Sequence, residues 1–437
     1  MTPTTSRRVL RAIAVGGLLI LLVDAALNAQ QNWRGAGIAA FDEVWQTIND
    51  TFYDPDFNGL DWAALRRDLR PRVEHAETAD DIRRLINEML RRLGQSHFVL
   101  LTSSAVGQPV AGDAMVPIEM RVMDEGVVVT RADGPALNGA IRPGDVLVAI
   151  DGRDPLASAA GPSERERRLD AWRHAFRELH GLPGSVARLT VRDLTGAERT
   201  VDVMRVRKTG ASVTLGNLPE LHVRTESSDE RSPGGRRVGV IAFNAWMAAV
   251  AEPIARAVDR YRQADGIVVD LRGNIGGLAD MMRGVAGHFL ATPALLGRLQ
   301  MRSATLEFRA NPRRSTADGR RVEPYDGPLA ILVDEHTASA SECFAGAMQS
   351  LGRARVFGTR TMGQALPAST RVLSNGDVLM YAVGDFTTST GTRLEGEGVQ
   401  PDEEVILSRR AVAEGRDEPL IRAFVWIDQQ ARAVTAR

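Results

Sequence analysis

From Val238 onward the chain alternates short apolar runs with amphipathic segments, and this alternation limits the fold more than any other feature of the sequence. Short apolar runs bounded by turn residues are typical of buried strands, whereas apolar residues spaced three and four apart are typical of helices. The predicted strands are VGVIAF, GIVVDLRG, PLAILVDE and ARVFGT, and the predicted helices are AAVAEPIARAVDRYRQ, LADMMRGVAGHFL and the segment after Ser339. Strands that alternate with helices favour a parallel sheet. The sequence therefore predicts an α/β core over residues 209–437.

The preceding segment, residues 105–208, has a different character. Short valine-rich runs separated by Gly, Pro and Asp turns predict a small β-rich domain. One insertion, SERERRLDAWRHAFRELHG, predicts a helix that begins with a capping box formed by Ser163 and Glu166. Its expected apolar face consists of Leu169, Trp172, Phe176 and Leu179. Residues 209–235 are polar, and the run TESSDERSPGGRR, which begins at Thr225, is expected to be an exposed loop.

Residues 30–104 are expected to form a helical segment, with helices between residues 38 and 93. The clearest helix is TADDIRRLINEMLRRLG, in which Thr78 can cap the start and Gly94 can end the last turn. The run QSHFVLLTS then leads into a short apolar strand.

The first 29 residues predict a signal peptide. Three arginines, Arg7, Arg8 and Arg11, precede a twelve-residue apolar run, Ala12–Val23. That run is short for a membrane span and typical of a signal-peptide core. An uncleaved anchor is the alternative, because Asp24 and Leu27 make a poor cleavage site. Either interpretation places the bulk of the protein outside the cytoplasm, periplasmic or secreted, and leaves a membrane tether open.

Composition excludes several classes of protein. The 437 residues carry a formal net charge of −1, which gives no basic field for nucleic acid. The single cysteine, Cys343, cannot form an intrachain disulfide. None of the seven histidines pairs with another at close metal-ligand spacing, so we expect no metal and no cofactor. Lys208 is the one lysine in the chain.

Three loops follow predicted strands, where α/β folds place their sites: DLRGNIGGL, DEHTASASE and GTRTMGQA. Ser339 with Glu342 fits a capping box, and Ser339 also fits a nucleophile at a helix start. From these residues alone the cap is the favoured interpretation. The Gly276–Gly277 pair before a helix can bind a developing negative charge or can simply form a tight turn.

The order of the motifs resembles a known family. LGQSH is followed by GAIRPGDVLVAIDG, VVDLRGNIGG, VDEHTASASECFAGAMQ, GTRTMGQ and EGEGVQPDEEV. This order resembles the C-terminal processing (tail-specific) serine peptidases, including their tricorn-like branch, from about residue 38 to about residue 408. The resemblance implies a ββα-spiral, crotonase-like peptidase core. It also implies a PDZ-like domain inserted between this core and the helical segment.

The resemblance also implies the catalytic residues. The T-A-S-A-S-E stretch places the nucleophile at Ser339 rather than Ser341. Many members carry a lysine base where this chain has Gln364, and glutamine cannot take a proton from a hydroxyl at neutral pH. The tricorn-like branch uses a serine–histidine pair and a late glutamate instead, which implies a base at His97, supported by Ser96 and Glu395. Glu397, two residues further on, remains an alternative to Glu395.

The remaining expected site residues follow from the same resemblance. The oxyanion hole would consist of the backbone N–H groups of Ala340 and Gly276, while Gln364 and Gly277 would contact substrate. The PDZ-like domain would bind an extended peptide by strand addition, and its carboxylate-binding loop would be Pro117 to Met120, which contains the predicted binding residues Ile118, Glu119 and Met120. Pro117 has no N–H and Glu119 adds a negative charge, so the sequence leaves open whether this loop reads a free C-terminus.

The expected function is hydrolysis of proteins or peptides. A catalytically inactive relative that binds peptides or scaffolds partners is the alternative. A crotonase-like acyl-CoA enzyme would share the core but would explain neither the signal segment nor the PDZ-like domain. The sequence leaves the natural substrate and the oligomeric state open.

Overall fold

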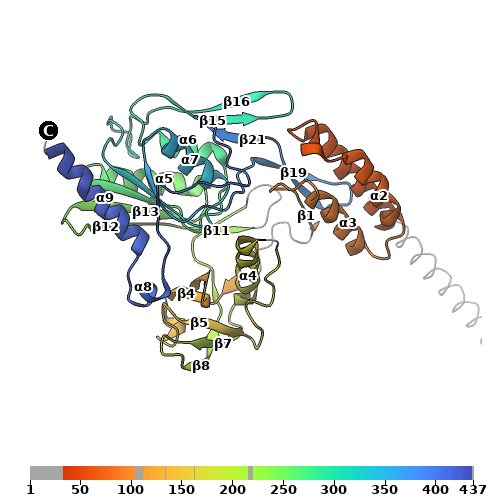
Figure 1. Ribbon diagram of the computed structural model, residues 1–437, viewed down its shortest axis with the longest axis horizontal. Helices are drawn as coiled ribbons and strands as arrows, with labels where there is room; N and C mark the ends of the chain where they lie inside the picture. The colour runs from red at the N-terminus through yellow and green to blue at the C-terminus, as the bar shows by residue number, and fades with distance from the viewer. Residues whose placement is uncertain (1–32, 104–111, 133, 162, 215–219, 436–437) are drawn as a thin grey trace, which may run out of the picture. The chain divides into compact units, whose positions relative to one another are not determined.

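The computed structural model describes residues 33–103, 112–132, 134–161, 163–214 and 220–435 (Figure 1). The predicted signal segment, residues 1–29, lies outside the described residues. The chain divides into two compact units. The first combines the described part of Met1–Ser103 with Ala368–Val383, and the second combines Ser104–Pro367 with Gly384–Arg437.

Helices make up most of the first unit, as predicted. They are residues 33–51, the 3-10 turn η1 (Phe57–Gly59), α2 (Trp62–Glu74) and α3 (Ala79–Arg91). Thr78 caps α3 in a capping box with Asp81, and the buried face of the helix consists of Ile82, Leu85, Ile86, Met89 and Leu90. The periodic apolar residues and the Thr78 cap thus predicted this helix correctly, and it was the clearest helix in the sequence.

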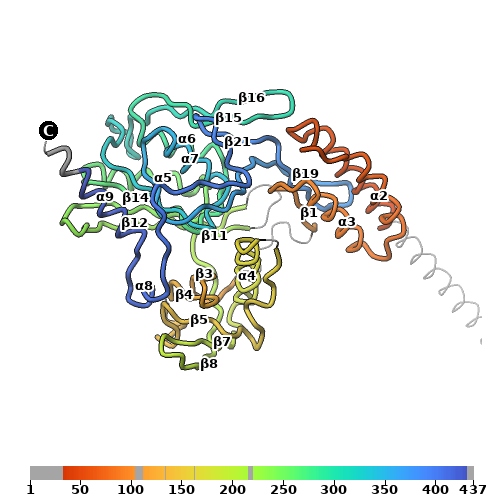
Figure 2. Tube along the Cα trace, in the orientation of Figure 1, coloured from red at the N-terminus to blue at the C-terminus, as the bar shows by residue number. Residues whose placement is uncertain are grey.

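A small antiparallel sheet completes the first unit. Its strands are β1 (Val99–Leu101), β19 (Ala368–Val372) and β20 (Val378–Ala382), in the order β1-β20-β19. The β19–β20 hairpin comes from late in the chain and lies beside β1 (Figure 2). This hairpin falls within residues 209–437, the predicted range of the core, yet it packs in the first unit.

A six-stranded sheet forms the centre of the second unit. Its order is β12-β13-β14-β17-β18-β22, and all neighbouring pairs from β13 onward are parallel. The strands are β12 (Thr225–Arg231), β13 (Arg237–Phe243), β14 (Gly266–Asp270), β17 (Leu329–Val333), β18 (Arg355–Gly358) and β22 (Glu403–Glu404). The four predicted strands of the core are confirmed.

The expectation of an exposed loop at TESSDERSPGGRR is wrong. Residues Thr225–Arg231 form β12, which pairs antiparallel with β13 along its whole length. Most of its side chains are exposed because β12 lies at the edge of the sheet. Polar side chains are common on edge strands, where they discourage pairing with other chains. The polar composition of residues 225–231 therefore gave no sign of a strand, because this strand forms by pairing with β13.

Helices cover both faces of this sheet (Figure 1). The helices of the second unit's core are α5 (Ala248–Tyr261), α6 (Ala279–Ala286), α7 (Ala340–Ser350), α8 (Arg409–Ala413) and α9 (Glu418–Thr435). Helices α5, α6 and α7 share one apolar cluster with Ile267, Val269 and Ile331. Helix α9 packs against the alternate residues Val268 and Ala330. Because successive strand residues point to opposite faces, α9 lies on the face opposite α5–α7.

Two smaller antiparallel sheets flank the core. The first contains β15 (Ala294–Gln300), β16 (Thr305–Ala310) and β21 (Asp385–Thr388), in the order β16-β15-β21. The second pairs β10 (Ala211–Val213) with β11 (Leu221–Val223).

The predicted β-rich segment forms a five-stranded antiparallel sheet in the order β3-β4-β5-β7-β8. Its strands are β3 (Ile118–Met123), β4 (Gly126–Ala132), β5 (Val146–Ile150), β7 (Val186–Arg192) and β8 (Glu198–Met204). The short elements η3 (Pro135–Leu137), β2 (Ala114–Met115), β6 (His180–Gly181) and β9 (Val206–Arg207) lie around it. The predicted helix is α4 (Glu164–Leu179), with its capping box at Ser163. Its fully buried residues are Ala171, Ala175 and Leu179, while Trp172 and Phe176 are only partly buried.

Candidate active site

Ser339 occupies a strained turn between β17 and α7. Its backbone has φ 56° and ψ −121°, in a region that residues other than glycine rarely adopt. The described residues include six non-glycine residues with positive φ, and two of them are Ser339 and His97. A strained turn between a strand and a helix is also how hydrolases present a nucleophilic serine.

Ser341, the other serine of the motif, is fully buried. Its hydroxyl accepts a hydrogen bond from Trp246 Nε1 at 2.8 Å and donates one to the Asn274 carbonyl at 3.1 Å. Both bonds join the start of α7 to neighbouring loops. Ser341 is therefore a structural residue, and Ser339, which is only partly buried, is the one available for chemistry.

The two glycines after β14 lie against the Ser339 turn. A Cβ added to Gly276 would lie 2.6 Å from Ser339 Cβ, and one added to Gly277 would lie 2.5 Å from the Trp246 carbonyl oxygen. Only glycine fits at such distances, and both residues have positive φ. The Gly276 N–H already donates to Asn274 Oδ1 at 3.0 Å. Gly276, the predicted oxyanion donor, would have to share or release that bond to serve.

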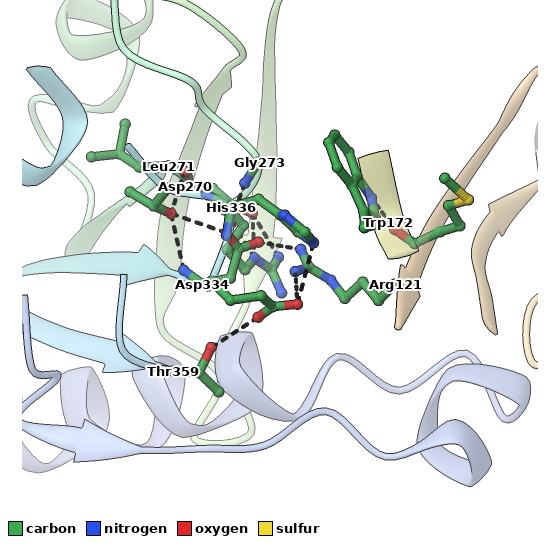
Figure 3. Close-up of polar contacts among 12 residues, drawn as sticks. Arg121, Trp172, Asp270, Leu271, Gly273, Asp334, His336 and Thr359 are labelled. Atoms are coloured by element: carbon green, nitrogen blue, oxygen red, sulfur yellow. Dashed lines mark hydrogen bonds and ion pairs between the residues drawn. The ribbon is translucent and has the colours of Figure 1, made fainter. Parts of the chain in front are cut away.

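Asp334 holds together the loops that follow β14 and β17 (Figure 3). Its Oδ1 accepts the Gly273 and His336 N–H groups, at 3.0 Å and 2.9 Å. Arg121 donates to Asp334 and also, at 3.1 Å, to Glu335. The Arg121 guanidinium lowers the pKa of Asp334 to about 2 against the opposing effect of burial. Asp334 is thus an ionised anchor for the loop that leads to Ser339.

The segment after β18 approaches the same turn. The Gln364 carbonyl accepts the Ser339 N–H at 2.9 Å, so the predicted substrate-binding residue contacts Ser339 through its backbone. The next N–H, that of Ala365, donates to Glu395 at 2.8 Å. Glu395 is buried, whereas Glu397 is exposed and pairs with Arg360 at 3.3 Å. Of the two alternatives, the structure brings Glu395 next to the segment that contacts Ser339.

The predicted base lies in the first unit. His97 follows α3 with φ 62°, and its Nδ1 lies 2.7 Å from Ser96 Oγ. Burial lowers the pKa of His97 to about 4, so its imidazole is neutral over most of the pH range. The Ser96 hydroxyl and the His97 ring thus lie within hydrogen-bond distance, and a neutral imidazole can accept a proton.

The three predicted peptide-binding residues begin β3. The side chains of Ile118 and Met120 are buried in the core of the β-rich sheet, and Glu119 is exposed. The Met120 carbonyl accepts the Trp172 indole N–H at 3.2 Å. Any contact that Ile118 or Met120 makes with a peptide would therefore use the backbone of β3, an edge strand.

Sequence patterns assign no role in this site to Asn274 and only a local one to Glu342. Asn274 is fully buried; its side chain joins the Gly276 N–H to the Phe243 carbonyl, and its own carbonyl accepts the Ala338 N–H. Glu342 was noted only as part of a capping box, yet it binds groups well outside its helix. The capping motif was the only signal for Glu342, and it indicated a local role.

Within the described ranges, no group of three or more His, Cys, Asp or Glu side chains could hold a metal ion. The helices of the described part are too short or too polar to cross a membrane.

Comparison with known proteins identifies the relationship. The Peptidase family S41 domain matches residues 237–405, and the Tricorn protease C1 domain matches residues 38–91. The chain is 28% identical over 375 residues to the carboxyl-terminal-processing protease of Picosynechococcus sp. (strain ATCC 27264 / PCC 7002 / PR-6), and the match covers 83% of this chain and 82% of that protein. It is 26% identical over 329 residues to the "Probable CtpA-like serine protease" of Staphylococcus haemolyticus (strain JCSC1435), covering 73% of this chain and 59% of the relative.

Solved structures have the same fold. The photosystem II D1 C-terminal processing protease matches with a TM-score of 0.56 and 23% identity, over 85% of this chain and 93% of that one. Mature CPAF matches with a TM-score of 0.62 and 13% identity, over 91% and 96%. Both domain matches and the named relatives agree with the expected resemblance. The chain thus carries a Peptidase family S41 domain and a Tricorn protease C1 domain, and it has relatives named carboxyl-terminal-processing proteases.

Proposed function

We propose that this chain is a serine endopeptidase in which Ser339 attacks the peptide carbonyl and His97 accepts its proton. The strained Ser339 turn at the start of α7 carries the proposal, because such backbone persists where function requires it. Gln364 at the usual lysine position favours a histidine base. With Ser96 at Nδ1 of His97, the other ring nitrogen, Nε2, would take the proton.

The negative charge that develops on the substrate oxygen would be stabilised by backbone N–H groups. We assign one donor to Ala340, the first residue of α7, and the other to the Gly276–Gly277 turn. The N-terminus of α7 adds a favourable dipole. Glu395 would act with Ser96 to orient His97 and to stabilise the charged imidazolium.

We further infer that the core has the ββα-spiral topology and that residues 105–208 form a PDZ-like domain. An extended peptide would pair with the edge strand β3, a form of recognition that uses main-chain hydrogen bonds. The apolar run Ala12–Val23 supports a location outside the cytoplasm, with the segment cleaved or kept as a tether. Proteins and peptides are the proposed substrates.

A fluorophosphonate probe and a generic peptide substrate test the proposal together. Ser339→Ala should abolish both labelling and hydrolysis, since removing a nucleophile costs several orders of magnitude in rate. Ser341→Ala is the matched control and should keep both in its folded fraction. A wild-type protein that neither labels nor cleaves would favour the inactive, peptide-binding alternative. Loss of activity in Ser341→Ala but not in Ser339→Ala would show that Ser341 is the nucleophile.

A further inference from the structure

Glu342 is a fully enclosed carboxylate in the first turn of α7, three residues after Ser339. One oxygen, Oε2, accepts the Ser339 N–H at 3.0 Å and the Gln364 N–H at 2.9 Å. The other, Oε1, accepts the Gly363 N–H and the Thr361 hydroxyl, each at 2.6 Å. Burial raises the pKa of Glu342, and the four donors act against that rise. Each oxygen thus accepts two hydrogen bonds.

These bonds join segments that follow neighbouring strands. The Ser339 turn follows β17, and the segment 361–364 follows β18. The Thr361 hydroxyl in turn accepts the Val399 N–H at 2.7 Å, which extends the connection to the segment just after Glu395. One carboxylate therefore links the nucleophile turn to the two other segments of the candidate site in this unit.

Helix capping explains only part of this arrangement. The capping box of α4 gives the comparison: Glu166 accepts the Ser163 N–H at 3.0 Å and the Ser163 hydroxyl at 2.6 Å. Both of those donors belong to the cap residue of the same helix, and Glu166 is exposed. Glu342 is buried and takes three of its four donors from residues 361–364.

We propose that Glu342 is a positioning residue for the reaction of Ser339, an inference that rests on the proposed function. It fixes the Ser339 backbone and the segment of Gln364, whose carbonyl accepts the same Ser339 N–H. The direction in which the Ser339 hydroxyl points depends on the conformation of that backbone. Glutamine cannot substitute, because its amide nitrogen would face two donors wherever it was placed.

The test compares Glu342→Gln with Glu166→Gln, the matched change in the capping box of α4. Both are assayed as full-length protein below their unfolding temperatures, with circular dichroism as the check on folding. Glu342→Gln should lower kcat by about 100-fold and leave KM within about 3-fold, because small misplacements of reacting groups have effects of this size. The rate of fluorophosphonate labelling should fall in parallel. Glu166→Gln should match wild type in all three quantities.

Thr361→Val provides a second, milder probe of the same contact. It should lower kcat by about 10-fold, and the double variant should be no worse than Glu342→Gln by more than about 2-fold, since the two side chains act as a unit. A folded Glu342→Gln with kcat within about 3-fold of wild type would overturn the inference. If Glu342→Gln does not fold, an unchanged kcat in Thr361→Val overturns it instead. Failure of the proposed function would appear separately, as wild-type protein without Ser339-dependent labelling.

Discussion

Arg83 and Asp377, 294 positions apart in the chain, form a two-point ion pair inside the first unit. Arg83 Nε and Nη2 donate to the two carboxylate oxygens of Asp377 at 2.9 Å and 3.1 Å. Asp377 is fully buried and also accepts the Ser103 N–H at 3.1 Å. The pair fixes the β19–β20 hairpin to α3, the helix that leads to His97.

Asp377→Ala should therefore destabilise the protein by about 3 kcal/mol, because it leaves a guanidinium without its buried partner. Asp80→Ala is the matched control, since Asp80 pairs with the same Arg83 at 2.8 Å but is exposed. It should change the free energy of unfolding by less than about 0.5 kcal/mol. Urea unfolding of the two variants checks both values, and equal effects would show that burial of the pair is unimportant.

Strain at Ser339 predicts an unusual order of stability. Ser339→Gly should be more stable than Ser339→Ala by about 1 kcal/mol, because glycine adopts φ 56° and ψ −121° without steric cost and this outweighs its greater entropy in the unfolded chain. Thermal unfolding of the two inactive variants measures the difference. Ala340, which is helical, gives the control: there glycine should be the less stable choice.

The low pKa of His97 predicts where activity fails in acid. A base must be neutral, so hydrolysis should persist below pH 6 and fall only as the pH drops through about 4. The folded pKa lies below the ordinary value of about 6.5, so the unfolded chain takes up the proton more readily. The stability that His97 contributes is thus complete above about pH 6.5 and is lost as the pH falls towards 4.

A pH–rate profile of kcat/KM, with circular dichroism at each pH, separates loss of the base from unfolding. His97→Ala should remove activity as thoroughly as Ser339→Ala. His75, exposed at the end of α2, is the control, and His75→Ala should leave the profile unchanged. An acid limb near pH 6.5 in a fully folded protein would contradict the low pKa.

Glu395 and Glu397 offer a matched pair of substitutions. Glu395→Gln should lower kcat by about 10- to 100-fold, because it removes a buried charge that would support the imidazolium. Glu397→Gln should stay within about 2-fold of wild type, since Glu397 is exposed beside Arg360. Steady-state kinetics of the two variants decide between the residues, and the reverse ranking would reassign the role.

Sequence periodicity was sufficient to predict the helices and strands whose apolar residues are buried together in a core. The core strands β13, β14, β17 and β18 and the helix α3 all appear where predicted. The periodic pattern failed at β12, whose polar residues are ordered by pairing with β13. It also gave no indication that the β19–β20 hairpin joins β1, because that pairing depends on residues far apart in sequence.

In the candidate site, too, local motifs predicted some features, and others depend on contacts between distant segments. The motif T-A-S-A-S-E indicated Ser339, and the structure explains Ser341 by its buried bonds to Trp246 and Asn274. Backbone strain at Ser339 and the bond from the Gly276 N–H to Asn274 arise only when separate loops meet. The four donors of Glu342 come mostly from a segment about twenty residues later, so a local capping motif could not reveal them.

The first unit is built from two stretches of chain, and this has a consequence for biosynthesis. A growing polypeptide folds from its N-terminus as segments emerge, but β1 has to wait for β20 before it gains its partner. Ser339 emerges before that hairpin does. The unit that holds His97 can therefore be completed only after the Ser339 turn has been synthesised, so a chain that stalls before β20 would leave β1 without its partner strand.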